Sequence, residues 1–222
     1  MNRIDLTPIY VLHTRPFRNT SLLVDLFSEK YGRVSVVARS ARGLKSRYQN
    51  KLQLFTPLLA SWFGNRELKS LGNIEFNGTP LRLNHQNLFC AFYLNELLMR
   101  VLHKEDSYSQ LFGYYHDALI SLENNHDITK ILRLFEKRLL TALGYAFHFE
   151  KIISDRYYHF DYQHGFVVCD DPSKFLGSDL IFISEENFCS EKVLHSAKKL
   201  MRLALAPLIG NNPLNSNIFF KH

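Results

Sequence analysis

Residues 21–39 read SLLVDLFSEKYGRVSVVAR, and they carry the clearest structural pattern of the chain. Residues 21–28 and 33–39 each alternate between two faces, which is the period of a β-strand. One face is apolar in both segments (Leu22, Val24, Leu26, then Val34, Val36, Ala38). Between the segments, Glu29–Gly32 predicts a hairpin turn, because Gly32 can adopt a positive φ without steric cost. The stretch therefore predicts an antiparallel hairpin with one face turned to a core.

Further strand-like segments lie on both sides of this hairpin. Residues 8–15 form a short β-branched and aromatic run, and residues 52–63 and 67–76 are also strand-like. Between the hairpin and these last two segments, residues 40–50 are basic and rich in turn formers. Five strands in about 80 residues fit a small closed barrel, most commonly the OB-fold, with an SH3-like barrel as the competitor.

After residue 80 the hydrophobic period changes to that of helices. Apolar residues recur at steps of three and four, which predicts four amphipathic helices (87–104, 107–122, 127–143 and 191–206). Asp127 and Ser190 are the expected N-caps, and Gly144 is the expected glycine after the third helix. Pro207 is expected at the C-terminal end of the fourth helix.

These patterns predict an α+β protein of two domains. Residues 1–80 form the five-stranded OB-fold barrel that binds nucleic acid, and residues 81–222 form an all-α helical domain. Within the second domain, residues 148–189 are expected to be an irregular or β-like insert. The boundary between the domains is expected near residues 78–84, where the period changes.

The positive charge of the chain is concentrated in the barrel. The 222 residues carry a formal charge of +6, with 46% hydrophobic and 22% charged residues, an ordinary globular balance. Residues 1–80 hold twelve Lys/Arg and five Asp/Glu, a net of +7, so the remaining chain is at −1. Residues 30–66 contain eight basic residues and no acidic one. Such a run favours a polyanionic partner.

Several classes of protein are disfavoured. Three cysteines without a C-x-x-C pair exclude a disulfide scaffold and a four-cysteine zinc site. The N-terminus has no apolar signal region, and no apolar run reaches the length of a membrane helix, so we expect a cytoplasmic protein that does not bind membranes. Nucleotide-binding and hydrolase motifs are absent, which favours a protein that is not an enzyme and needs no cofactor.

One cluster keeps an enzymatic alternative open. Six potential metal ligands lie within 13 residues: His159, Asp161, His164, Cys169, Asp170 and Asp171. Their spacing matches no standard metal site, and residues of these types are common on ordinary loops. We therefore expect no bound metal, while a metal-dependent nuclease stays the alternative. An RNA-associated OB module is a second alternative.

The basic residues of the barrel are interleaved with aromatic ones, a combination typical of single-strand binding. The expected phosphate contacts are Arg15, Arg18, Arg33, Arg39, Arg42, Lys45, Arg47 and Lys51. Most aromatic rings must belong to the barrel core. Tyr31 in the turn and Tyr48 in the basic loop are expected to be exposed, and these two are the candidates for stacking on bases.

The helical domain offers a second candidate site. Arg133, Lys137 and Arg138 lie beside the apolar face of the third helix, and Arg100 lies late in the first. A groove with apolar walls and a cationic rim suits an acidic peptide that ends in a hydrophobic residue. Charges that only keep an amphipathic helix soluble are the alternative explanation.

With these residues laid out, the chain resembles the bacterial RecO family of DNA repair proteins. The strongest similarity lies in residues 10–16, 21–28, 32–42 and 52–59, and weaker matches follow in residues 93–98, 132–136, 143–145 and 213–216. Several separate matches in the correct order are far more specific than any one of them. Many members carry four zinc-binding cysteines between the last helices. This chain has only Cys169 and Cys189 there, which predicts that it has no structural zinc.

The resemblance implies a function and partners. RecO proteins bind single- and double-stranded DNA, anneal complementary strands and hydrolyse no nucleotide. They contact the acidic C-terminal tail of single-stranded DNA-binding protein and, with RecR, help RecA to load onto coated strands. The family's tail site lies in the helical domain, so Arg133 is the first candidate for this contact, followed by Arg100, Lys137 and Arg138. A protein with these partners is expected at the nucleoid.

Overall fold

The structure is a computed structural model that describes residues 3–43, 45–210, 214 and 216. It contains two compact units, residues 1–125 with 214–222, and residues 126–213. The first unit therefore holds two helices together with the barrel, whereas the sequence places the domain boundary at residue 80. That boundary stays a prediction. Among the described residues, no helix is both long and apolar enough to cross a membrane.

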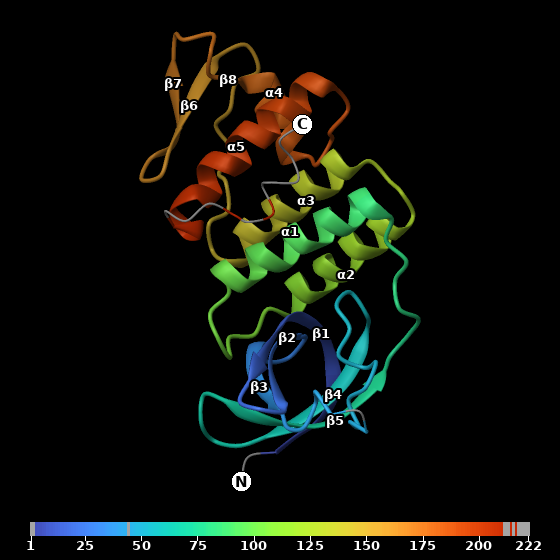
Figure 1. The fold of residues 1–222 in the computed structure, drawn as a ribbon. Helices are drawn as coiled ribbons and strands as arrows, with labels where there is room; N and C mark the ends of the chain where they lie inside the picture. The colour runs from blue at the N-terminus through green and yellow to red at the C-terminus, as the bar shows by residue number, and fades with distance from the viewer. Residues whose placement is uncertain (1–2, 44, 211–213, 215, 217–222) are drawn as a thin grey trace. The chain divides into compact units, whose positions relative to one another are not determined.

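The first unit contains the predicted five-stranded barrel. Its strands are β1 (Arg3–Phe17), β2 (Ser21–Ser28), β3 (Gly32–Ala38), β4 (Leu58–Phe63) and β5 (Lys69–Phe76). They close in the order β1-β2-β3-β5-β4 (Figure 1), which is the order of an OB-fold and not of an SH3-like barrel. The β3–β5 seam is parallel and pairs only Val36 with Lys69 and Val37 with Ser70.

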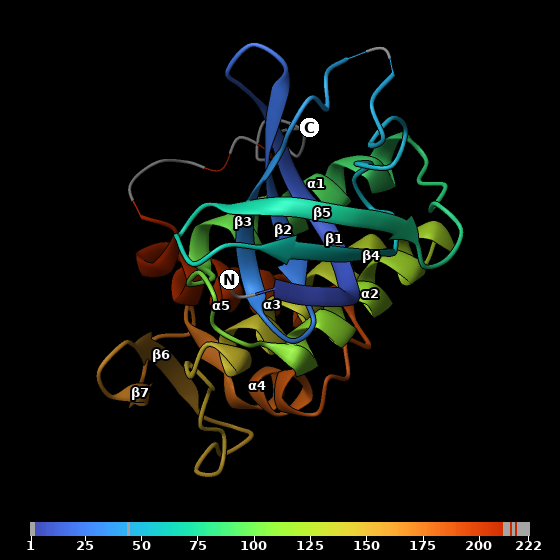
Figure 2. The same cartoon turned by 90° about the horizontal axis from the view of Figure 1, so that it is seen from below.

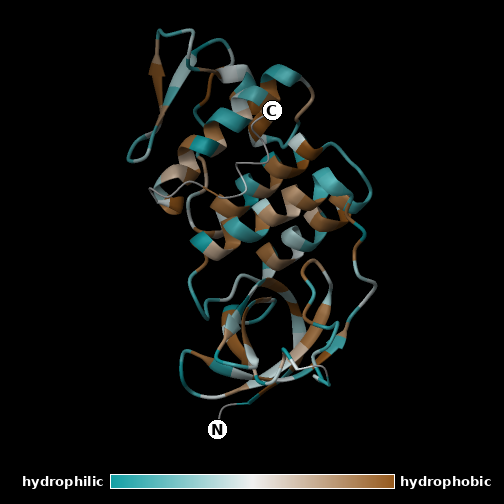
Figure 3. Ribbon diagram, in the orientation of Figure 1, coloured by the Kyte–Doolittle hydropathy of each residue, from teal (hydrophilic) through white to brown (hydrophobic). Residues whose placement is uncertain are grey.

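The barrel core follows the alternation of the decisive hairpin. Val24, Leu26, Val34 and Val36 are fully buried inside it, as predicted, and Leu22 packs at its edge. Figure 3 shows brown residues recurring along these strands. Gly32 has a φ of +60°, also as predicted. A Cβ there would lie 1.7 Å from the Asp106 carbonyl oxygen, so only glycine fits this approach.

Two strand boundaries differ from prediction for local reasons. β4 begins at Leu58 rather than at residue 52, because Phe55 adopts a φ of +57° and Pro57 cannot donate to a ladder. β1 is longer than predicted and pairs with both β2 and β4. Its register with β2 shifts between Val11 and His13, which leaves Leu12 as the extra residue.

Two helices of the same unit pack against the outside of the barrel. They are α1 (His85–Val101) and α2 (Ser109–Glu123), close to the predicted ranges. Tyr10 and Phe27, on the outer face of β1 and β2, contact Phe112 and Tyr115 of α2 with ring centroids 5.1–6.0 Å apart. Burial, with Asp117 nearby, raises the pKa of the Tyr10 hydroxyl.

A buried hydrogen-bond chain fixes the register shift in β1. The Asn95 side-chain amide donates to the Leu12 carbonyl at 2.9 Å, and the Tyr115 hydroxyl donates to Asn95 Oδ1 at 2.5 Å. Asn95 is 3% exposed and Tyr115 is fully buried. Buried polar groups need such partners, so both helices hold the shifted strand in place.

The second unit contains three helices and a small sheet. Its elements are α3 (Ile128–Ala142), β6 (Tyr157–Asp161), β7 (Gly165–Cys169), β8 (Phe175–Leu176), α4 (Gly177–Ser184) and α5 (Glu191–Ile209). α3 and α4 both pack on α5, and the sheet has the order β7-β6-β8. The predicted N-caps are confirmed: Asp127 accepts from two backbone amides, and Ser190 accepts from one.

The ends of the helices in this unit show how the chain replaces missing hydrogen bonds. Gly144 has a φ of +84° and closes α3 as predicted. α5 runs through Pro207, which was expected to end it. Proline has no N–H for the carbonyl of Leu203 four residues earlier, and the Tyr162 hydroxyl donates to that carbonyl instead.

The predicted insert at residues 148–189 is β-like in part and also contains α4. This helix is only eight residues long and rich in β-branched and aromatic residues, a composition that indicates a strand when read locally. Packing against α5 buries Leu180 and Ile183. Tertiary burial therefore overrides the local preference.

We predict that Asn95→Ala destabilises the protein by about 3 kcal/mol, because it removes the donor to the Leu12 carbonyl and the acceptor of the Tyr115 hydroxyl. Urea unfolding followed by circular dichroism measures this. Asn73→Ala, an exposed asparagine on β5, is the matched control and should cost under about 0.5 kcal/mol. Equal losses in the two variants would contradict the role of the buried chain.

Candidate nucleic-acid interface

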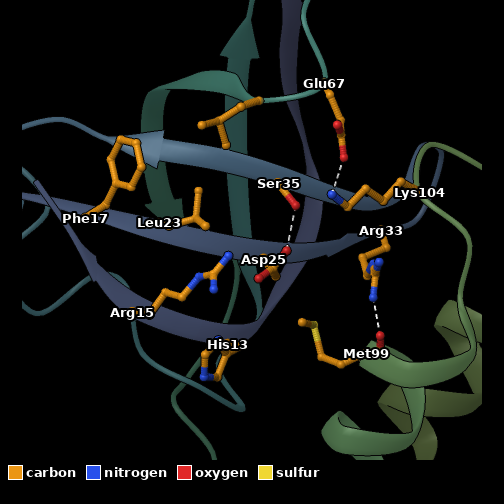
Figure 4. A pocket seen from close by; sticks show the side chains of 11 residues that line it. His13, Arg15, Phe17, Leu23, Asp25, Arg33, Ser35, Glu67, Met99 and Lys104 are labelled. Atoms are coloured by element: carbon orange, nitrogen blue, oxygen red, sulfur yellow. Dashed lines mark hydrogen bonds and ion pairs between the residues drawn. The ribbon is translucent and has the colours of Figure 1, made fainter. Parts of the chain in front are cut away.

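An open cavity of about 560 Å³ lies on the outer face of the barrel. Figure 4 shows side chains from β1, β2 and β3 along its wall, with further residues from the β4–β5 loop and from α1 and the segment after it. The lining residues are His13, Arg15, Phe17, Leu23, Asp25, Arg33, Ser35, Glu67, Leu68, Met99 and Lys104. All of them belong to the first unit.

The register shift at Leu12 turns three of the following β1 side chains toward this cavity. Tyr10 lies on the outer face of the barrel and Val11 in the core. Uninterrupted alternation would turn His13, Arg15 and Phe17 inward with Val11. The extra residue reverses the parity, so these three side chains lie outside, and His13 stands opposite Asp25 in the ladder.

Arg33 has a structural role as well as a place in the cavity. Its Nη1 donates to the carbonyl of Met99 in the last turn of α1, where a cation is favoured by the helix dipole. Its Nε is buried and has no hydrogen-bond partner in the described residues. Lys104 also lines the cavity and pairs with Glu67 of the β4–β5 loop.

The basic loop between β3 and β4 lies beside the β1–β2 turn. The backbone N–H of Arg42 donates to Thr20 at 2.9 Å, and its guanidinium donates to Asn19 at 3.4 Å. Figure 2 shows both segments projecting beyond the strands on the same side. This arrangement brings Arg42 close to the turn that contains Arg18. Arg39 and Lys45 are exposed, and Lys51 is half-buried.

The two predicted stacking tyrosines do not lie in the cavity. Tyr48 is 3% exposed, contrary to the prediction that it is exposed. Its hydroxyl donates to the Leu71 carbonyl at 2.8 Å and ties the basic loop to β5, and the Arg47 guanidinium lies 4.8 Å from its ring centroid. Tyr31 is half-buried, packs edge-on against Trp62 and lines a separate cavity of about 310 Å³.

Of the eleven residues that line the cavity, sequence reasoning named only Arg15 and Arg33 and missed the other nine. His13 and Phe17 share the period of Arg15 along β1, so this two-residue repeat was a usable signal. Lys104 follows α1 and is far from the barrel in sequence. The isolated bridge between Arg33 and Lys104 and the ion pair of Lys104 with Glu67 bring it to the site.

The barrel cations and the predicted tail-binding cations differ in their pairing. Within the part of the chain that the structure describes, none of the eight predicted phosphate contacts takes part in an ion pair. All four predicted tail contacts do: Arg100 with Glu96, Arg133 with Glu136, and both Lys137 and Arg138 with Glu186. Arg100 belongs to the first unit and the other three to the second.

Glu186 is held in a conformation that brings it to two cations of α3. It follows the cap of α4 with a φ of +58°, a region that is costly for any residue but glycine. Its carboxylate lies 2.8 Å from Arg138 Nη2 and 3.5 Å from Lys137 Nζ. Burial opposes its ionisation, but Arg138 and Lys137 outweigh this effect and hold the pKa of the Glu186 carboxyl below its ordinary value of 4.5.

The side chain of Arg133 is largely buried and is not freely available to a peptide. It is 7% exposed, its Nη2 donates to Glu136 at 2.6 Å, and its Nε has no hydrogen-bond partner in the described chain. A ligand carboxylate at this position would therefore have to displace or share an existing pair.

The potential metal ligands of the insert do not converge. In the described residues, no group of three His, Cys, Asp or Glu side chains could hold a metal ion. Asp161 instead holds the β6–β7 turn: it accepts from the backbone of Gln163 and His164, each at 2.8 Å. These hydrogen bonds lower the pKa of the Asp161 carboxyl.

Comparison with known proteins gives a consistent result over the whole chain. A family model described as the N-terminal part of recombination protein O matches residues 1–79, and one for its C-terminal part matches residues 82–166. A protein of Coxiella burnetii named DNA repair protein RecO is 44% identical, with 96% of each chain covered. Proteins of the same name from Vibrio cholerae and Aliivibrio fischeri are 42% and 38% identical, covering 96% and 95% of this chain and 92% and 93% of theirs.

We predict that Glu186→Gln lowers the free energy of unfolding by about 0.5–1 kcal/mol at pH 7. A carboxyl whose pKa is lower in the folded state stabilises above its unfolded pKa, and this stabilisation is lost as the pH falls through the folded pKa. The difference from the parent protein should therefore shrink below about pH 4.5. Urea unfolding across this range measures it, with exposed Glu185→Gln as the control. A loss that is independent of pH would contradict the ion-pair explanation.

Proposed function

The chain belongs to the RecO family and so has a role in DNA repair and recombination; from this premise we propose that its barrel binds single- and double-stranded DNA and anneals complementary strands. The observation that carries the proposal is that the eight predicted phosphate contacts of the barrel form no ion pair in the described residues. A cation that no carboxylate neutralises is available to a phosphate, and its charge attracts a polyanion from a distance.

The position of the cavity supports the same proposal. In OB-folds, nucleic acids bind over strands 2 and 3 and between the loops that follow strands 1 and 4. Here the cavity spans Leu23 and Asp25 of β2, Arg33 and Ser35 of β3, and Leu68 of the β4–β5 loop. Phosphate contacts would come from Arg15, Arg18, Arg39, Arg42, Lys45 and Lys51, with Arg33 and Arg47 as contacts whose hydrogen bonds also stabilise the fold. Neutralising two repelling backbones lowers the barrier to annealing, and this requires no catalysis.

We predict that changing Arg39, Arg42 and Lys45 together to Glu slows strand annealing at least tenfold. The triple change reverses three charges on the exposed loop, and steered association is sensitive to such reversal. Annealing of two labelled complementary oligonucleotides, followed by energy transfer at several salt concentrations, measures the rate.

The matched control reverses three exposed cations on α5, Lys192, Lys198 and Arg202, with the same change in net charge. Its annealing rate should stay within about twofold of the parent rate. An unchanged rate in the loop variant, or an equal loss in the control, would contradict the proposed role of the loop.

We further propose that the second unit contacts the acidic tail of single-stranded DNA-binding protein, and that RecR and, indirectly, RecA are partners, as the family resemblance implies. The Glu186 ion pairs support a specific form of this proposal. Lys137 and Arg138 already hold one carboxylate in a strained position, so a peptide carboxylate can take its place. Glu186 then competes with the peptide.

We predict that Glu186→Gln tightens binding of a peptide ending in acidic residues and Phe by about threefold, because it removes the competing charge. Arg138→Ala should weaken binding at least fivefold, and Arg133→Ala tests the deeper position. Isothermal titration of the full-length protein measures all three. Weaker binding in Glu186→Gln would show that this carboxylate does not compete with the peptide.

A further inference from the structure

A single buried carboxylate lies among the cations of the cavity. Asp25 is 6% exposed and lines the cavity wall (Figure 4). Its Oδ1 accepts a hydrogen bond from Ser35 Oγ at 2.6 Å. Over residues 3–43, 45–210, 214 and 216, Asp25 takes part in no ion pair, and its Oδ2 accepts no hydrogen bond. Oδ2 is therefore an acceptor of a largely buried side chain that is left open to the cavity.

Because of this carboxylate, one part of the cavity repels a phosphate while another part attracts it. A phosphate is attracted to Arg15, which forms no ion pair with any described residue, but it is repelled by the carboxylate of Asp25. A site designed only to hold the backbone would gain nothing from a carboxylate there. The space next to Asp25 therefore suits a neutral group with N–H donors, because such a group satisfies the open acceptor without introducing a like charge.

An unpaired base has these properties and fits the remaining walls. The cavity volume of about 560 Å³ lies in the range of small-ligand pockets. Leu23, Phe17 and Leu68 supply apolar surface for the faces of a base. The exocyclic amino group of cytosine donates to a carboxylate, whereas thymine has a carbonyl acceptor at the same place, which Asp25 repels.

We propose, on the premise of the DNA binding proposed above, that the cavity takes one unpaired base and that Asp25 selects cytosine over thymine. Ser35 positions the carboxylate by occupying Oδ1, so that Oδ2 meets the amino group. Arg15 holds the adjoining phosphate. The barrel thus has a base-reading position within a surface that otherwise reads only the backbone.

The test compares two fluorescently labelled oligonucleotides, dC12 and dT12, with the full-length protein at matched salt. Both are flexible pyrimidine strands of equal charge, so their phosphate contacts are equivalent. Fluorescence anisotropy should show that dC12 binds about fivefold more tightly, which is the lower end of the discrimination expected from one specific base contact.

Asp25→Asn is the decisive variant. Its amide oxygen can still accept from Ser35, while its amino group now donates toward thymine, so the preference should be abolished or reversed. Glu75→Gln is the matched control: it neutralises an exposed carboxylate of β5 outside the cavity, and the preference for dC12 should persist. Melting temperatures and the salt dependence of binding establish that each variant retains the fold and the phosphate contacts.

The outcomes separate this proposal from the proposed function. Equal affinity of the parent protein for dC12 and dT12 would overturn base selection and leave DNA binding intact. A preference for dC12 that is unchanged in Asp25→Asn would also overturn base selection and leave DNA binding intact. The Asp25–Ser35 pair would then be only a cross-strand hydrogen bond. Absence of salt-dependent binding to either strand would overturn DNA binding by the barrel, and base selection with it. The parent comparison needs no variant, so misfolding of Asp25→Asn cannot hide a negative result.

Discussion

The hydrogen bonds from Tyr115 to Asn95 and from Asn95 to the Leu12 carbonyl determine how the first unit is built. They hold an extra residue in β1, and that residue sets which side of the strand faces outward. Before Leu12, the side chains of β1 that face inward complete the barrel core. After Leu12, the side chains of β1 that face outward line the cavity. The helices thus do more than cover the barrel, since they supply the polar groups that keep its longest strand in the functional register.

The distribution of charge pairs differs between the predicted site residues of the two units. The eight barrel cations predicted to contact phosphates take part in no ion pair within the described residues, although Arg3 and Lys69 do, and free charges of this kind suit a partner that brings many phosphates. In the second unit, Arg133, Lys137 and Arg138 are each opposed by a glutamate. A partner there must replace an existing contact, so its binding depends on local geometry more than on total charge. The formal charge of +6 is a sum over the whole chain and does not show this difference in ion pairing between the two units.

The sequence predicted the features that depend on local periodicity. The alternation of residues 21–28 and 33–39 located the core of the barrel, and the caps at Asp127, Ser190 and Gly144 were predicted correctly. It did not predict the features that depend on a distant partner. The parity of β1 depends on Asn95, the burial of Tyr48 depends on β5, and the continuation of α5 through Pro207 depends on Tyr162. The open acceptor of Asp25 could not be predicted either, because it depends on the pairing of β2 with β3.

The parallel seam between β3 and β5 has a mechanical consequence. Only two residue pairs join these strands, while the other four seams of the barrel are longer. The cavity extends across this seam, from Ser35 on β3 to Leu68 just before β5. Separating the two strands there breaks fewer ladder hydrogen bonds than separating any other pair, so we expect local opening of the barrel to begin at this seam. For the DNA binding proposed above, a wall that opens at one seam would let the same surface admit either a single strand or a duplex.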